Sequence, residues 1–143
     1  MTDDILNLIP HRPPMVMIDS VEETGEASVR AVKTFAPGDF GTDGTRVMEP
    51  VLVECLAQAA AAIQGIEAGK TGNAPAAGML VGIDGFEIKN TAVTGIPIEI
   101  NVEITRRFGP FAFAEGALAQ DGKTLAHGSL KFYIAGGGSE APR

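Results

Sequence analysis

The segment from residue 51 to about residue 68 constrains the fold of this chain more than any other. It predicts one long helix, because Pro50 suits the start of a helix and only Gly65 interrupts the helix-forming residues. The helix is apolar on nearly every side, and such a helix is buried on most of its faces in a folded protein. The rest of the chain must therefore wrap around it.

The residues on both sides of this helix have the patterns of β-strands. After the helix, four β-like runs are joined by turn sequences such as Asp121-Gly122, at residues 79–89, 96–108, 111–119 and 124–134. Before the helix, the sequence predicts a short amphipathic helix and then a hairpin around Thr24-Gly25, at residues 3–9, 15–23 and 26–33. We predict an α+β fold with a mostly antiparallel sheet curled around one long central helix.

The length and composition fit one domain. The chain has 143 residues and is 45% hydrophobic, which suffices for a single core over residues 1–135. The Gly-rich residues 136–143 are expected to form a disordered tail. With 11 basic residues, 18 acidic residues and a net charge of −7, the chain is not expected to bind nucleic acid.

The sequence also indicates a location. A lone cysteine, Cys55, cannot form a disulfide within the chain, and residues 1–4 lack the basic start of a signal peptide. The most apolar stretch contains Glu54 and Gln58, so no segment is expected to cross a membrane. We therefore expect a cytoplasmic protein without membrane insertion.

Three ordered motifs resemble the bacterial 3-hydroxyacyl-[acyl-carrier-protein] dehydratases. They read LIPHRPPMVMID at residues 8–19, ECLAQA at residues 54–59 and LVGID at residues 80–84. The resemblance implies a hotdog fold and a homodimer or dimer-based oligomer, with the acyl chain bound along the subunit interface. It also implies dehydration of 3-hydroxyacyl thioesters to trans-2-enoyl thioesters in fatty-acid or polyene-type synthesis. The substrate would be carried by acyl carrier protein or CoA, with no metal and no cofactor besides the phosphopantetheine of the carrier.

One departure from the family concerns its catalytic histidine. The family has a Gly-His-Phe-Pro segment before the helix, whereas this chain reads Gly38-Asp39-Phe40-Gly41 and has no histidine between His11 and His127. The pattern is more similar to a divergent branch, the dehydratase-like hotdog proteins of aryl-polyene-type gene clusters. The identity of the base therefore cannot be taken from the resemblance.

Dehydration requires a base for the α-proton, an acid for the departing hydroxyl and a donor for the thioester oxygen. Glu54 is the candidate acid, with a structural carboxylate paired to a basic residue such as Arg46 as the alternative. Asp39 and His11 are the candidate bases. The alternatives are a turn-forming role for Asp39 and a structural histidine bonding backbone groups for His11.

Four further residues are expected to bind substrate: Gln58, Pro50, Val51 and Phe40. Gln58 shares the helix face of Glu54, so it is expected either to orient that carboxylate or to bond backbone groups in the core. The backbone amides near residues 48–52 are natural oxyanion donors. Cys55 is expected to be a small core residue, and His127 to be exposed.

Three basic residues, Lys89, Arg106 and Arg107, could meet an acidic carrier protein or the pantetheine phosphate, or could be solvated charges at strand edges. Two other functions remain open because hotdog domains support several chemistries. One is an acyl thioesterase in which Glu54 activates water. The other is a catalytically silent subunit that binds acyl chains or completes a heterodimer with an active dehydratase.

Overall fold

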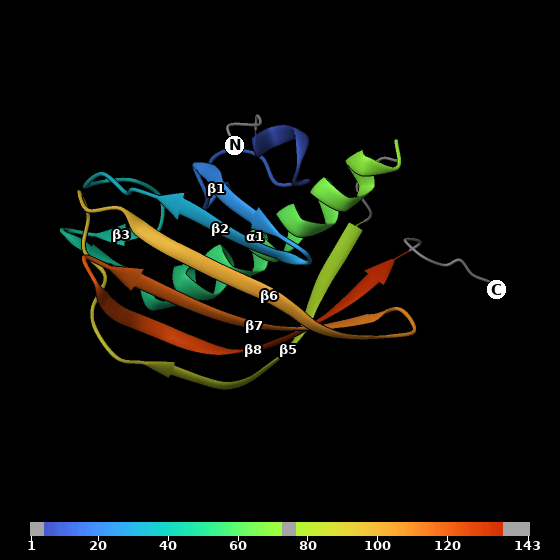
Figure 1. Cartoon of the computed structure of the whole chain (residues 1–143). Helices are drawn as coiled ribbons and strands as arrows, with labels where there is room; N and C mark the ends of the chain where they lie inside the picture. Colours follow the sequence, from blue (N-terminus) through green and yellow to red (C-terminus); the bar gives the residue numbers. More distant parts are fainter. Residues whose placement is uncertain (1–4, 73–76, 136–143) are drawn as a thin grey trace.

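One long helix, α1 (Glu49–Lys70), lies against one face of a six-stranded sheet in the computed structural model (Figure 1). The structure describes residues 5–72 and 77–135. The remaining elements are, in chain order, η1 (Ile5–Asn7), β1 (Ser20–Gly25), β2 (Ser28–Lys33), β3 (Thr42–Asp43), β4 (Arg46–Val47), β5 (Ala77–Ile88), β6 (Ile98–Phe108), β7 (Phe111–Gln120) and β8 (Lys123–Ala135).

The strands pair antiparallel throughout the large sheet, in the order β1-β2-β6-β7-β8-β5. The predicted central helix and the four strands after it are thus confirmed. The turn between β7 and β8 has Asp121 and Gly122 at φ 54° and 81°, which are the positive angles that the tight two-residue hairpin needs. In Figure 1 the sheet curves around α1 and covers one side of it.

The sheet approaches α1 closely because small residues face it. On β7 the buried residues alternate with the outward ones, and Gly116 is one of those that face the helix. A Cβ atom at Gly116 would come within 2.8 Å of a methyl group of Leu56 on α1. Leu56 and its neighbour Cys55 are fully buried between helix and sheet. This contact sets the spacing of the two layers.

The first half of the chain differs from the prediction at the hairpin. The first strand begins at Ser20 rather than at Met15, and the turn lies at Glu26-Ala27, since Gly25 still pairs with Ser28. Residues 15–18 are not a strand because their backbone bonds a side chain instead of a neighbouring strand: Gln58 contacts the amide of Met17 and the carbonyl of Met15. The error at the start of the strand arises from contacts that local alternation does not reveal.

Other boundaries shift by a few residues. The helix begins at Glu49 after the N-cap Met48, so Pro50 is its second residue, where the missing N–H is still harmless. The loop at residues 36–44 runs into a short pair of strands, β3 and β4. The predicted N-terminal helix is a single 3₁₀ turn, η1. The predicted disordered tail lies outside the described residues.

By length and composition α1 could cross a membrane, although no segment of the sequence was expected to do so. Half of its apolar window is buried inside the protein. The core helix of a globular domain passes the same test, and this one packs against β2, β6 and β7. Its apolar character is thus accounted for by burial in the fold.

Candidate functional site

Residues 8–17, here called the N-terminal segment, lie against α1 and bring His11 to the helix. Leu8 and Ile9 are buried at the start of this segment, and Met17 is buried at its end. Figure 1 shows η1, directly before the segment, beside the C-terminal half of α1. His11 lies between these buried ends in sequence.

Glu54 and His11 meet although they are 43 positions apart. The Nε2 atom of His11 lies 3.5 Å from Oε2 of Glu54. Their side chains are 29% and 35% exposed, respectively, so Glu54 is less buried than the apolar pattern of its helix suggested. The alternative partner of Glu54, Arg46, forms an ion pair with Asp43 instead, with 3.5 Å between the guanidinium nitrogen and Oδ2. The pair can therefore be reached from solvent and can exchange protons.

The two ring nitrogens of His11 have different surroundings. Nδ1 is buried, and no described residue forms a hydrogen bond with it. Nε2 faces Glu54. The sequence-based alternative, a histidine that bonds backbone groups, has no such bond among the described residues. Nε2 is thus the ring nitrogen that a substrate could approach.

Gln58 connects the helix to the N-terminal segment. Its amide nitrogen donates to the carbonyl oxygen of Met15 at 2.6 Å and to Oε2 of Glu54 at 2.8 Å, while its Oε1 accepts from the amide of Met17 at 2.6 Å. Gln58 is completely buried. Gln58 therefore bonds both the Glu54 carboxylate and backbone groups of the core, as its two expected roles would require.

The other candidate base, Asp39, does not join this cluster. Its Oδ2 accepts a hydrogen bond from the amide of Ala36 at 2.8 Å, and its carbonyl accepts bonds from Thr42. These are bonds within the loop and correspond to the turn-forming alternative. The neighbouring Phe40 is exposed.

The predicted substrate-binding residues at the start of α1 divide into exposed and buried ones. Pro50 is exposed, whereas Val51 is buried beneath the loop, where a Cβ at Gly41 would come within 2.6 Å of it. Two of the expected oxyanion donors already have partners. The amide of Met48 donates to the carbonyl of Gly41, and the amide of Val51 donates to the carbonyl of Met48. Pro50 has no amide hydrogen, and within the described residues the amide of Glu49 forms no hydrogen bond, so it is a free donor of this turn.

The remaining ionisable residues have structural surroundings. Cys55 is a buried core residue, and burial raises the pKa of its thiol to about 12. Arg107 makes two 3.0 Å bonds to Glu67, and Arg106 stacks 4.4 Å from the ring centre of Phe113. Lys89 pairs with Glu87 at 3.0 Å. Among residues 5–72 and 77–135, no three potential ligands gather as a metal site would require.

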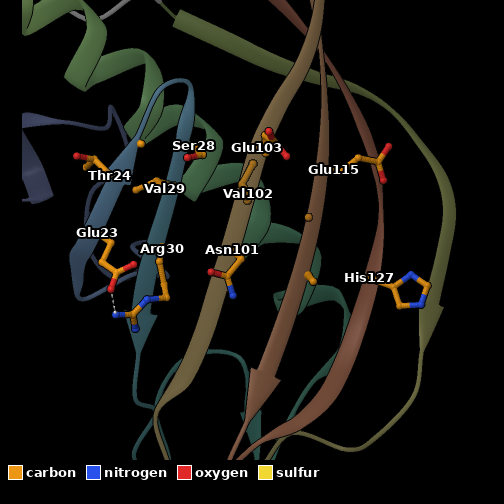
Figure 2. A pocket seen from close by; sticks show the side chains of 13 residues that line it. Glu23, Thr24, Ser28, Val29, Arg30, Asn101, Val102, Glu103, Glu115 and His127 are labelled. Atoms are coloured by element: carbon orange, nitrogen blue, oxygen red, sulfur yellow. Dashed lines mark hydrogen bonds and ion pairs between the residues drawn. The ribbon is translucent and has the colours of Figure 1, made fainter.

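A hollow of about 640 Å³ lies away from the His11 and Glu54 pair, on the outer face of the sheet. Figure 2 shows Glu23 and Arg30 joined by an ion pair on one side of it and His127 on the other, with Asn101 between. The hollow is not lined by His11, Glu54 or Gln58. Its polar and charged walls do not suit an acyl chain.

Comparisons with known proteins agree with this architecture. Residues 3–138 match the family model described as "ApeP-like: ApeP dehydratase". The chain is 34% identical to the 3-hydroxyacyl-[acyl-carrier-protein] dehydratase FabZ of Bacillus pumilus over 91% of this chain and 92% of that protein. It is also 34% identical to the dehydratase of the same name from Halalkalibacterium halodurans, over 92% and 96% of the two chains.

Solved structures share the fold at lower identity. The dehydratase heterocomplex ApeI:P of Xenorhabdus doucetiae matches with a TM-score of 0.81 and 19% identity, over 93% of this chain and 91% of that chain. Zebra fish thioesterase superfamily member 2 matches with a TM-score of 0.64 and 19% identity, over 81% and 80%. The predicted hotdog fold is confirmed by the architecture and by these neighbours.

Proposed function

Because this chain belongs to the ApeP-like dehydratase family, we propose that Glu54 and His11 are the acid and the base of a 3-hydroxyacyl-thioester dehydratase. The activity is that of a hydro-lyase, which removes water from a 3-hydroxyacyl thioester and yields the trans-2-enoyl thioester. The observation that supports the residue roles is the 3.5 Å separation of His11 Nε2 and Glu54 Oε2. A histidine from the N-terminal segment thus lies beside the helix carboxylate, although the loop before the helix lacks one.

The reaction needs two proton transfers, and the pair has one group for each. Nε2 of neutral His11 takes the α-proton, and the electrons of the C–H bond form the new double bond. Protonated Glu54 gives its proton to the β-hydroxyl, which leaves as water when the C–O bond breaks. The products are the enoyl thioester, water, an imidazolium and a carboxylate.

The surroundings of Glu54 favour one of its two oxygens as the carrier of the proposed transferable proton. Oε2 accepts the hydrogen bond from Gln58, so the transferable proton of Glu54 belongs on Oε1. After turnover, the imidazolium of His11 and the carboxylate lie side by side and stabilise each other. Both side chains are partly exposed, so water can restore their protons. The amide of Glu49 is the backbone donor proposed for the thioester oxygen.

The test is an assay of three variants with 3-hydroxyacyl thioesters of both carrier types. His11→Gln and Glu54→Gln should each lower the rate of enoyl formation by roughly 100-fold or more, because each removes one proton transfer. Asp39→Asn should retain most of the activity. The opposite pattern, with Asp39→Asn inactive and His11→Gln active, would transfer the role of base to Asp39.

The same assay separates the two other functions. Release of free thiol without an enoyl product would indicate a thioesterase, whose fold neighbours are less similar than the dehydratase heterocomplex. If the wild-type protein alone is inactive but gains activity with a second hotdog subunit, the heterodimer alternative is correct. Melting temperatures of all variants, measured by circular dichroism, show whether a loss of rate reflects unfolding.

The free edge of the sheet supports a dimer. β5 is the terminal strand, and its side chains include the exposed Met79, Val81 and Ile83. The opposite edge, β1, carries Glu22 and Glu23 instead, which discourage strand pairing. We assign β5 as the edge that pairs with a second copy of the chain, and light scattering of the purified protein tests this.

The names of the relatives support a proposal for the substrate carrier. Their names specify acyl-carrier-protein substrates, and we extend this to the present chain, with CoA thioesters as the alternative carrier. Proton transfer between side chains needs neither a metal nor an added cofactor. We also propose that the reaction takes place in the cytoplasm. Comparing turnover of the same acyl group on the two carriers tests the carrier assignment.

A further inference from the structure

Gly65 lies directly beneath the N-terminal segment. A Cβ atom at this position would overlap the carbonyl oxygen of Leu8 and come within 2.8 and 2.9 Å of the carbonyl carbon and Cα of Leu8. These are backbone atoms, which cannot rotate away as the end of a side chain can. Gly65 is therefore the point where the backbone of the segment rests on α1.

Helix propensity alone does not explain a glycine here. The helix is otherwise rich in alanine, with four consecutive alanines at residues 59–62, and glycine is less favourable than alanine within a helix. Gly65 is buried, so it is not a helix end that needs a flexible residue. The close approach of Leu8 supplies a reason for this residue.

A second attachment lies closer to Glu54 on α1. Gln58 holds the backbone of Met15 and Met17, four residues from Glu54 and seven from Gly65. Positions 54, 58 and 65 lie on one face of a helix with 3.6 residues per turn. His11 is in the part of the segment between these two attachments, and the guanidinium of Arg12 bonds the carbonyls of Ile9 and His11.

We infer that Gly65 is a positioning residue: by letting the Leu8 backbone rest on α1, it sets the place of His11 beside Glu54. The inference rests on the proposed function only where it concerns the effect of Gly65 on catalysis. The location of His11 can be measured without an activity assay. Gly65 itself touches neither substrate nor the reacting atoms.

The chain provides a matched pair of variants, Gly65→Ala and Gly69→Ala. Both replace a glycine of the same helix, but a Cβ at Gly69 meets nothing within 4 Å. The chain has only two histidines, so ¹H–¹³C spectra of the full-length protein with labelled histidine contain the signals of two imidazole rings, and the Cε1–H signal of each ring is followed. Gly65→Ala should move the His11 signal and leave that of His127 in place, and Gly69→Ala should move neither.

Kinetics then separate this inference from the proposed function. With a 3-hydroxyacyl thioester, Gly65→Ala should lower kcat at least ten-fold with little change in KM and alter the pH profile, while Gly69→Ala should match the wild type. If the His11 signal moves but kcat does not, the role of His11 as base is wrong and the positioning by Gly65 stands. An unmoved His11 signal overturns the inference. Loss of the folded core in Gly65→Ala also overturns it, because the inference requires the segment to yield while the helix remains.

Discussion

Cys55 and Glu54 are neighbours on α1 and have opposite surroundings. Cys55 is completely buried against the sheet, whereas the Glu54 side chain is 35% exposed and faces His11. The division between core and site therefore passes between two adjacent residues. A helix makes this possible because successive side chains point about 100° apart.

The Cys55 thiol should make the stability of the protein depend on alkaline pH. Burial raises its pKa from 9.0 to about 12, so the unfolded chain loses this proton first as the pH rises. Its contribution is therefore complete below about pH 9 and is lost between about pH 9 and pH 12. Between pH 8 and pH 10.5, the wild type should lose about 2 kcal/mol more of its free energy of unfolding than Cys55→Ala.

Urea unfolding at the two pH values measures this difference. Lysine and tyrosine titrations are common to both proteins, so they cancel in the comparison. Equal losses in the wild type and in Cys55→Ala would mean that the thiol becomes accessible to water without global unfolding.

The sequence predicted only some of the residues that form the candidate site. The motif around Glu54 identified the helix carboxylate, and the four-residue spacing predicted that Gln58 shares its face. The sequence left both Asp39, near the position of the family's histidine, and His11 as candidate bases, because the 3.5 Å approach of His11 is a contact between residues 43 positions apart. Gly65 was noted only as an interruption of the helix, although the cost of a glycine inside a helix calls for a packing or functional reason.

At the scale of elements, the distance between α1 and the sheet depends on Gly116 of β7. A methyl group there would press on the side chain of Leu56, which is fully buried, so that side chain or the helix would have to shift. Gly116→Ala should therefore lower the free energy of unfolding by about 1–3 kcal/mol, as for other overpacked cores. Chemical denaturation with a linear extrapolation measures the change.

Ala117 is the control for this prediction. It follows Gly116 on β7 but faces outward, where it lines the hollow of Figure 2. Ala117→Val should change the stability by less than about 0.5 kcal/mol. A neutral Gly116→Ala would show that the helix shifts away from the sheet at little cost.

The elements themselves differed in how well the sequence predicted them. The strands from β5 to β8 follow alternation and turn residues, which are local signals, and their predicted positions are confirmed within a few residues. The first strand was predicted five residues too early because residues 15–18 bond Gln58, a side chain that lies 41 positions after Met17. A local pattern carries no information about such a partner.

At the scale of the whole molecule, the exposed side chains of β5 are the clearest sign of assembly. Ile83→Lys should convert a dimer to a monomer, because it places a charge in the proposed contact. Size-exclusion chromatography with light scattering measures the mass. Phe108→Lys is the control, since Phe108 is 74% exposed at the β6–β7 turn and lies away from that edge. A dimer that persists in Ile83→Lys would place the contact elsewhere.

The strand order has a consequence for synthesis on the ribosome. β2 is paired with β6, and Val32 faces Glu99 across that ladder. The apolar α1 is therefore synthesised before β6 and β7, two of the strands that pack against it. We expect a nascent chain that ends near residue 76 to bind an apolar dye strongly and the complete chain to bind it weakly. Until β6 emerges, we expect chaperones to be needed to keep this helix from aggregating.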